Sequence, residues 1–267
     1  MKKIWVSLVT PFDKSLKVDY QAIRKYVAFL DKYDFAGFLL AGSVGEGLLL
    51  DPQEIADYIK IIREISNKQI MVGIIDFNYI NAQKKMNLDA DILLVTPAIY
   101  FKPSKAAVVE YLKKIAHTTN KKVMLYNNPG RVCVALDFKQ YDELYSIENI
   151  VGVKECDDSI ALEMISKYPK WEVFTGNDNF LVNEKIVGAV STLANIVPSL
   201  SLNLSGNENF VKWNTLCDMA YSLPNPIAVK LVLQELGLME SHFRAQFGTL
   251  PKFEHMMNFI TDCKLKN

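Results

Sequence analysis

The stretch IVGVKEC, residues Ile150–Cys156, is a short apolar run that ends on a lysine. Three of its residues are β-branched, Gly152 leaves room for a close neighbour, and acidic residues follow Lys154. Such a run predicts a buried parallel strand. The lysine either marks where the strand meets water or is a buried amine. Desolvation favours the uncharged amine, which is the nucleophilic form.

Similar apolar runs recur along the chain and alternate with segments of helical periodicity. The predicted strands are 5–9, 35–41, 69–75, 91–95, 122–126, 150–154, 171–175 and 189–193. The predicted helices are 20–33, 52–62, 81–87, 105–115, 136–145, 159–168 and 179–187, with caps at Asp19, Asp51 and Ser104. Eight strands alternating with helices predict an α/β fold, a (β/α)8 TIM barrel. No GxGxxG motif follows the first strand, which disfavours an open dinucleotide-binding sheet.

The strand pattern stops after residue 200. We expect a barrel over residues 1–200 and a short C-terminal helical region over 201–267. One helix begins at Asn225-Pro226 and is stopped by Gly237, and a final helix follows Pro251.

Composition narrows the range of functions. The 267 residues carry no formal net charge, which gives no reason to expect nucleic acid or an anionic membrane as partner. The four cysteines have no CxxC pair and no metal-ligand spacing with the three histidines, so we expect reduced thiols and no metal. The N-terminal apolar run is too short for a signal peptide, and no stretch is long enough to span a membrane. We expect a cytoplasmic protein.

In a TIM barrel, function collects at the carboxyl ends of the strands. Tyr126 and Lys154 end neighbouring predicted strands, which pair about 4.8 Å apart. If both point inward, an amine and a phenol face each other in a dry pocket, an arrangement suited to Schiff-base chemistry. The alternative is that Tyr126 covers the core with its hydroxyl in water.

Two further strand ends carry candidate binding groups. The turn Gly42–Glu46 can present N–H groups to a carboxylate, or it is an ordinary glycine-rich loop. Arg131, on the loop after the fifth strand, can clamp a carboxylate with two hydrogen bonds, or it is a surface charge.

The strand ends together resemble the dihydrodipicolinate synthase / N-acetylneuraminate lyase family of pyruvate-dependent class I aldolases. The matching segments are LVTPFD (8–13), GSVGE (42–46), LLVTP (93–97), YFKPS (100–104), LYNNPGR (125–131), GVKE (152–155), NPIAVK (225–230) and ELGL (235–238). They follow the family order over nearly the whole chain. The resemblance implies a (β/α)8 barrel that needs no metal or organic cofactor and is usually a homotetramer built from dimers.

The resemblance also implies catalytic roles by position. Lys154 matches the lysine that forms a Schiff base with pyruvate, and Tyr126 matches the tyrosine that relays protons. Ser43 and Tyr100 match the other two members of the relay. In dihydrodipicolinate synthases the residue at the position of Tyr100 reaches in from the neighbouring subunit.

The binding roles are implied in the same way. The N–H groups of Ser43 and Val44, in the turn that also holds Gly45, match those that bind the pyruvate carboxylate. Val190 matches a residue whose backbone carbonyl lines the pyruvate site. Arg131 matches the arginine that binds the carboxylate of aspartate semialdehyde.

The resemblance therefore implies condensation of pyruvate with L-aspartate 4-semialdehyde, giving 4-hydroxy-tetrahydrodipicolinate in lysine and diaminopimelate biosynthesis. The alternatives are another pyruvate aldolase, acting on a 2-keto-3-deoxy sugar acid or N-acetylneuraminate, and a non-catalytic paralogue that binds pyruvate or an amino acid.

The chain departs from the family pattern at several places. Val44 stands where a second hydroxyl residue is usual, and segments 76–89 and 203–223 are shortened, which leaves a homodimer and a homotetramer both open. Pro52 and Ile55 stand where lysine-inhibited relatives often carry histidines, so feedback inhibition by lysine is not expected.

Overall fold

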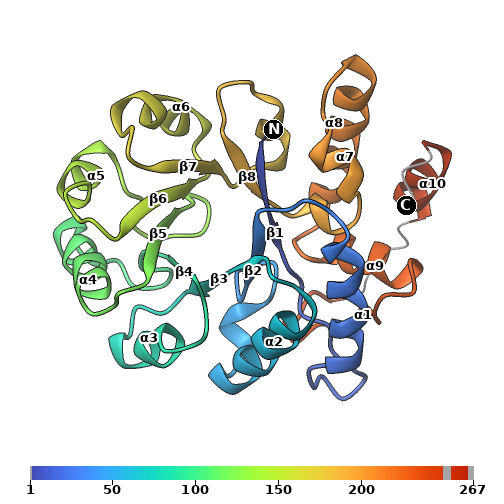
Figure 1. The fold of residues 1–267 in the computed structure, drawn as a ribbon, viewed down its shortest axis with the longest axis horizontal. Helices are drawn as coiled ribbons and strands as arrows, with labels where there is room; N and C mark the ends of the chain where they lie inside the picture. Colours follow the sequence, from blue (N-terminus) through green and yellow to red (C-terminus); the bar gives the residue numbers. More distant parts are fainter. Residues whose placement is uncertain (1, 249–253, 264–267) are drawn as a thin grey trace. The chain divides into compact units, whose positions relative to one another are not determined.

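The computed structural model describes residues 2–248 and 254–263. Eight strands close into a parallel barrel in chain order, which confirms the predicted (β/α)8 TIM barrel (Figure 1). The strands are β1 (Lys3–Ser7), β2 (Gly37–Leu40), β3 (Gln69–Ile74), β4 (Ile92–Val95), β5 (Lys122–Asn127), β6 (Ile150–Glu155), β7 (Glu172–Thr175) and β8 (Gly188–Ser191). All eight predicted strands are present, with ends displaced by two residues at the most.

Helices follow the strands and then form the C-terminal region. The α-helices are α1 (Tyr20–Asp31), α2 (Pro52–Ile65), α3 (Tyr79–Met86), α4 (Lys105–His117), α5 (Phe138–Leu144), α6 (Asp158–Lys167), α7 (Pro198–Leu202), α8 (Asn207–Tyr221), α9 (Ile227–Glu235) and α10 (Glu254–Asp262). Three 3-10 turns are η1 (Gly47–Leu49), η2 (Asp178–Val182) and η3 (Leu193–Asn195). The predicted caps are confirmed: Asp19 and Ser104 accept hydrogen bonds from first-turn N–H groups, and Asp51 forms a capping box with Glu54.

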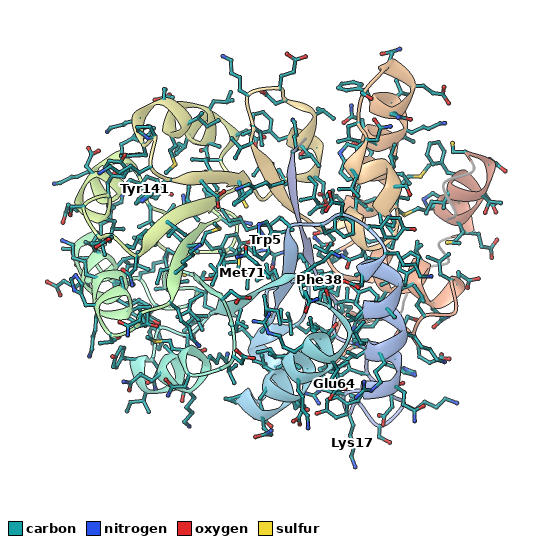
Figure 2. The ribbon with its side chains drawn as sticks, viewed as in Figure 1. Trp5, Lys17, Phe38, Glu64, Met71 and Tyr141 are labelled. Carbon is teal, nitrogen blue, oxygen red and sulfur yellow. The ribbon has the colours of Figure 1, made fainter. Side chains whose placement is uncertain are left out.

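The chain divides into two compact units. The first contains residues 3–68 and the described part of 191–267, and the second contains 69–190. The sequence pattern instead places a domain boundary at residue 200, between the barrel and the helical region. That boundary stays a prediction. In the first unit, Trp5 and Phe38 are buried among the other side chains, whereas Lys17 and Glu64 point outward (Figure 2).

Two segments differ from the sequence-based expectation. The helix predicted over 179–187 is only the 3-10 turn η2, which ends at Val182. The Asn183 side chain accepts a hydrogen bond from the Lys185 N–H, and Asn183 itself is extended, so local polar contacts replace a further helical turn. Helix α8 was not predicted, although its buried residues Trp213, Leu216, Cys217 and Ala220 have helical spacing.

The predicted end of the penultimate helix is confirmed. The C-cap of helix α9 is Leu236. Gly237 follows with a φ of +69°, a left-handed conformation that glycine adopts without strain. The final helix, α10, is also present, but Pro251 lies outside the described residues. Among the helices of the described residues, none has the length and apolar character needed to cross a membrane.

Candidate active site

The centre of the candidate site is the pair formed by the ends of β5 and β6. Tyr126 and Lys154 are register partners in the parallel ladder, so they lie at the same level and on the same face. This relationship confirms the level predicted from the sequence. Both side chains are buried, with exposed fractions of 5% for Tyr126 and 6% for Lys154. Lys154 therefore does not mark a point where the strand meets water.

The Lys154 amine lies over an aromatic ring instead of beside a carboxylate. Its Nζ is 4.5 Å from the centroid of the Tyr126 ring, within the range of a cation–π contact. Phe174 on β7 is the register partner on the other side and is fully buried. Within residues 2–248 and 254–263, Lys154 forms no ion pair and no hydrogen bond. Its nitrogen is thus uncommitted to such a partner, and once the ammonium gives up a proton its lone pair can attack a carbonyl carbon.

Gly176, directly after β7, provides the space that Lys154 occupies. A Cβ atom at this position would lie 2.8 Å from Lys154 Cε and 2.3 Å from Cys156 Sγ. Neither separation is compatible with van der Waals contact. The absence of a side chain at Gly176 is therefore a requirement of the lysine position. Gly152, earlier in β6, makes room for the backbone of the neighbouring strand, since a Cβ there would lie 2.1 Å from the Glu172 carbonyl oxygen on β7.

Cys156 is a neighbour of the lysine that the sequence did not single out. Burial raises the pKa of its thiol, while the Lys154 ammonium, the Tyr126 hydroxyl and the Arg131 guanidinium each act to lower it. A Cβ atom at Gly176 would meet both Cys156 Sγ and Lys154 Cε, so the thiol and the lysine side chain border the same small space. All four cysteines are free, as the sequence predicts.

Behind the strand ends, Glu155 holds the backbone in place. Side chains alternate along a strand, so Glu155 faces the opposite side from Lys154. It accepts hydrogen bonds from the Tyr141 hydroxyl (2.6 Å) and Asn127 Nδ2 (3.0 and 3.1 Å). The N–H groups of Cys156 and Asp157 each donate to it at 2.9 Å. Burial raises the pKa of the Glu155 carboxyl, and these donors oppose the rise.

In the first unit, the turn after β2 carries Ser43, Val44 and Gly45. The Gly47 N–H donates to the Gly42 carbonyl at 3.0 Å, and the Thr10 hydroxyl donates to the Gly45 carbonyl at 2.7 Å. In the part of the chain that the structure describes, the N–H groups of Ser43 and Val44 donate to no protein acceptor. The Gly42 and Gly45 carbonyls thus accept hydrogen bonds from within the protein, whereas the two N–H groups remain available as donors. Two such donors suit the binding of a carboxylate.

The remaining predicted residues have distinct environments. Arg131 is exposed on the turn after β5, and its backbone N–H donates to the Asn128 carbonyl at 2.8 Å. Tyr100 is 82% exposed, and its ring meets that of Phe101 edge-on at 5.3 Å. Among the described residues, Tyr100 forms no hydrogen bond to Tyr126. Val190 is buried within β8.

The structure therefore brings Lys154 and Tyr126 together, places Arg131 on the turn that follows β5, and leaves Tyr100 exposed on the surface. Among the residues described, no group of three His, Cys, Asp or Glu side chains is arranged to hold a metal ion. The supporting residues Asn128, Cys156 and Gly176 were missed as site residues. The strand-end positions of Cys156 and Gly176 were the available signal.

A model of the dihydrodipicolinate synthetase family matches residues 1–256. The chain belongs to this family. Enzymes of the family are lyases that form a Schiff base with pyruvate and act on small molecules.

Curated relatives named 4-hydroxy-tetrahydrodipicolinate synthase are similar to this chain over most of its length. The protein from Brachyspira hyodysenteriae is 26% identical over 284 residues, which cover 98% of this chain and 97% of the relative. The protein from Wolbachia pipientis is 29% identical over 258 residues, which cover 89% of this chain and 86% of the relative.

Solved structures share the fold. The chloride-inhibited dihydrodipicolinate synthase from Acinetobacter baumannii, complexed with pyruvate, has a TM-score of 0.87 and 25% identity, with 99% of each chain covered. A monomeric dihydrodipicolinate synthase variant has a TM-score of 0.89 and 21% identity, with 99% of this chain and 97% of that one covered. At 21% identity the likeness concerns the fold alone.

Proposed function

We propose that this enzyme is a 4-hydroxy-tetrahydrodipicolinate synthase, which condenses pyruvate with L-aspartate 4-semialdehyde in lysine and diaminopimelate biosynthesis. The observation that carries the proposal is the buried, uncommitted Lys154 amine at the level of Tyr126, with Arg131 on the adjoining turn. The names of the curated relatives support the same activity.

The reaction begins when Lys154 Nζ attacks the ketone carbon of pyruvate. Loss of water gives an imine, and its protonated nitrogen withdraws electrons from the neighbouring methyl group. Removal of a methyl proton gives an enamine, whose carbon attacks the aldehyde of the second substrate. The amino group of that substrate then attacks the imine carbon, closes the ring and releases Lys154. Tyr126 moves protons during imine formation and release.

The other residues divide between relay and binding. Ser43 and Tyr100 complete the proton relay, and the exposed position of Tyr100 is consistent with its insertion into the site of a second subunit, in a homodimer or homotetramer. The open N–H groups of Ser43 and Val44, in the turn with Gly45, bind the pyruvate carboxylate. The Val190 carbonyl lines the same site. Arg131 clamps the carboxylate of the semialdehyde.

The first experiment is chemical trapping. The enzyme is incubated with pyruvate and borohydride, digested, and analysed by mass spectrometry for a reduced adduct on Lys154. Lys230, a second buried lysine, provides the internal control because it is paired with Glu46 and should stay unmodified. Absence of the Lys154 adduct rejects both aldolase activities and favours the non-catalytic paralogue.

The second experiment identifies the partner aldehyde. Turnover is compared between aspartate semialdehyde and aldol substrates of the sugar-acid and N-acetylneuraminate types. In Arg131→Ala, the preference for the semialdehyde should fall by tenfold or more, because a charge-assisted carboxylate contact is lost. An unchanged preference in this variant counts in favour of the other pyruvate aldolases.

A further inference from the structure

The side chain of Asn128 joins the tyrosine of the site to the turn that carries the arginine. Its Nδ2 donates to the Tyr126 hydroxyl oxygen at 3.1 Å, and its Oδ1 accepts from the Gly130 N–H at 3.0 Å. An amide oxygen can only accept and an amide nitrogen can only donate. The bond from Gly130 therefore fixes which way the amide faces, and its NH2 group must be directed at Tyr126.

This donor determines what the tyrosine can do with its own proton. A hydrogen bond donated to the Tyr126 oxygen occupies one of its lone pairs. The O–H hydrogen must then point to a different acceptor. Lys154 Nζ lies 4.5 Å from the centroid of the Tyr126 ring, so the lysine is close to the tyrosine with which it would exchange a proton.

The backbone of the same residue shapes the arginine turn. The Asn128 carbonyl accepts hydrogen bonds from the Arg131 N–H at 2.8 Å and the Val132 N–H at 3.0 Å. Together with the side-chain bond to Gly130, these contacts close the Asn-Pro-Gly-Arg turn on Asn128. A single residue thus fixes both the base of the arginine turn and the hydroxyl of the tyrosine.

We propose that Asn128 is a positioning residue for proton transfer: its amide NH2 group holds the Tyr126 oxygen and directs the hydroxyl proton away from the arginine turn. The catalytic consequence rests on the proposed function, whereas the effect on the tyrosine itself does not. A purely structural Asn128 would shape the turn and leave the tyrosine unaffected. The two roles use different atoms of the side chain and can be separated.

The separating variant is Asn128→Asp. It keeps the oxygen that accepts from Gly130, and so keeps the turn, but replaces the donor to Tyr126 with a negatively charged acceptor. The titration of Tyr126 is followed by NMR in protein labelled with carbon-13 at tyrosine Cζ, and its signal is assigned by its loss in Tyr126→Phe. The titration midpoint should move to higher pH by about one unit in Asn128→Asp, and by less in Asn128→Ala.

Steady-state kinetics give a second readout. In Asn128→Asp, kcat should fall about tenfold and the pH limb that reports Tyr126 should move upward with the NMR midpoint. The KM for pyruvate should change little, since the Asn128 hydrogen bonds described above go to Tyr126 and to the arginine turn. A structural defect alone would lower the amount of folded enzyme without moving the pH limb.

Asn149→Asp is the matched control. Asn149 Nδ2 donates to the carbonyls of Ala116 (2.7 Å) and Thr119 (3.1 Å), before the start of β6. This variant should lose stability without shifting the Tyr126 midpoint. An unshifted Tyr126 midpoint in Asn128→Asp overturns the inference. Failure of the proposed function is seen separately, as the missing borohydride adduct on Lys154 in the unaltered enzyme.

Discussion

Lys230 on α9 donates a hydrogen bond of 2.7 Å to Glu46 Oε1, and both side chains are withdrawn from water. Lys230 also donates to the His242 carbonyl at 2.8 Å. The second carboxylate oxygen of Glu46 accepts from the N–H groups of Arg244 and Ala245, each at 2.9 Å. Glu46 itself has a left-handed φ of +54°. The C-terminal segment therefore fixes the end of the turn that carries Ser43 and Val44.

We expect Lys230→Met to lower the free energy of unfolding by about 3–5 kcal/mol, because it leaves a buried carboxylate without its cation. The double variant Glu46→Gln, Lys230→Met should recover most of this loss, because the unpaired charge is gone. Urea denaturation measures both. On the proposed function, the variants should also raise the KM for pyruvate more than they lower kcat.

Lys212→Met is the control for this pair. Lys212 forms an ion pair with Glu208 on α8, and the glutamate is largely exposed. Exposed pairs of this kind contribute little to stability because water and salt screen them. A loss in Lys230→Met no larger than that in Lys212→Met would contradict the anchoring role of the buried pair.

The buried pair also predicts a pH dependence. Burial lowers the pKa of Lys230 to about 8, even though Glu46 acts to raise it. The folded chain then binds this proton more weakly than the unfolded chain, in which the pKa is near 10.5. Between pH 8 and pH 10.5, the unfolding free energy of the unaltered protein should therefore rise relative to Lys230→Met. Denaturation at several pH values tests the sign, and a falling difference would show that it is wrong.

The Glu155 network predicts a second stability effect. Tyr141→Phe removes one donor from the buried carboxylate and should cost about 1–3 kcal/mol. The control variant Tyr145→Phe should cost less stability. The Tyr145 hydroxyl accepts a hydrogen bond of 3.2 Å from the Lys170 backbone N–H, which is exposed to water. Equal losses in the two variants would argue against a special role for the network.

The pH dependence of Tyr141→Phe has a definite sign. Burial already raises the pKa of Glu155 above its usual 4.5, and the lost donor should raise it further. A raised carboxyl pKa contributes stability below pH 4.5 that is lost as the pH rises through the folded value. The gap between the unaltered protein and Tyr141→Phe should therefore widen from pH 4.5 towards neutrality, as measured by urea unfolding.

The barrel and the Lys154–Tyr126 pair could be predicted because both follow from local order in the sequence. Buried strands show as apolar runs, and sequential parallel strands pair, so two strand-end residues fall at one level. The Glu46–Lys230 pair could not be predicted in this way, because its members are 184 residues apart. Arg131 and Asn128 share a short turn, but the direction of the Asn128 amide depends on the folded contacts of that turn.

Gly176→Ala tests whether the lysine position depends on the empty space beside it. The added methyl group would lie 2.8 Å from Lys154 Cε and 2.3 Å from Cys156 Sγ, so one or both side chains must move. Misplacement of a reacting group by about 1 Å can cost a hundredfold in rate. We expect a folded protein whose Lys154 adduct with pyruvate and borohydride forms about a hundredfold more slowly. Adding Cys156→Ala should restore part of the rate by removing the sulfur, while Cys156→Ala alone should trap pyruvate readily. An adduct rate in Gly176→Ala equal to that of the unaltered enzyme would mean that Lys154 reacts from a different position.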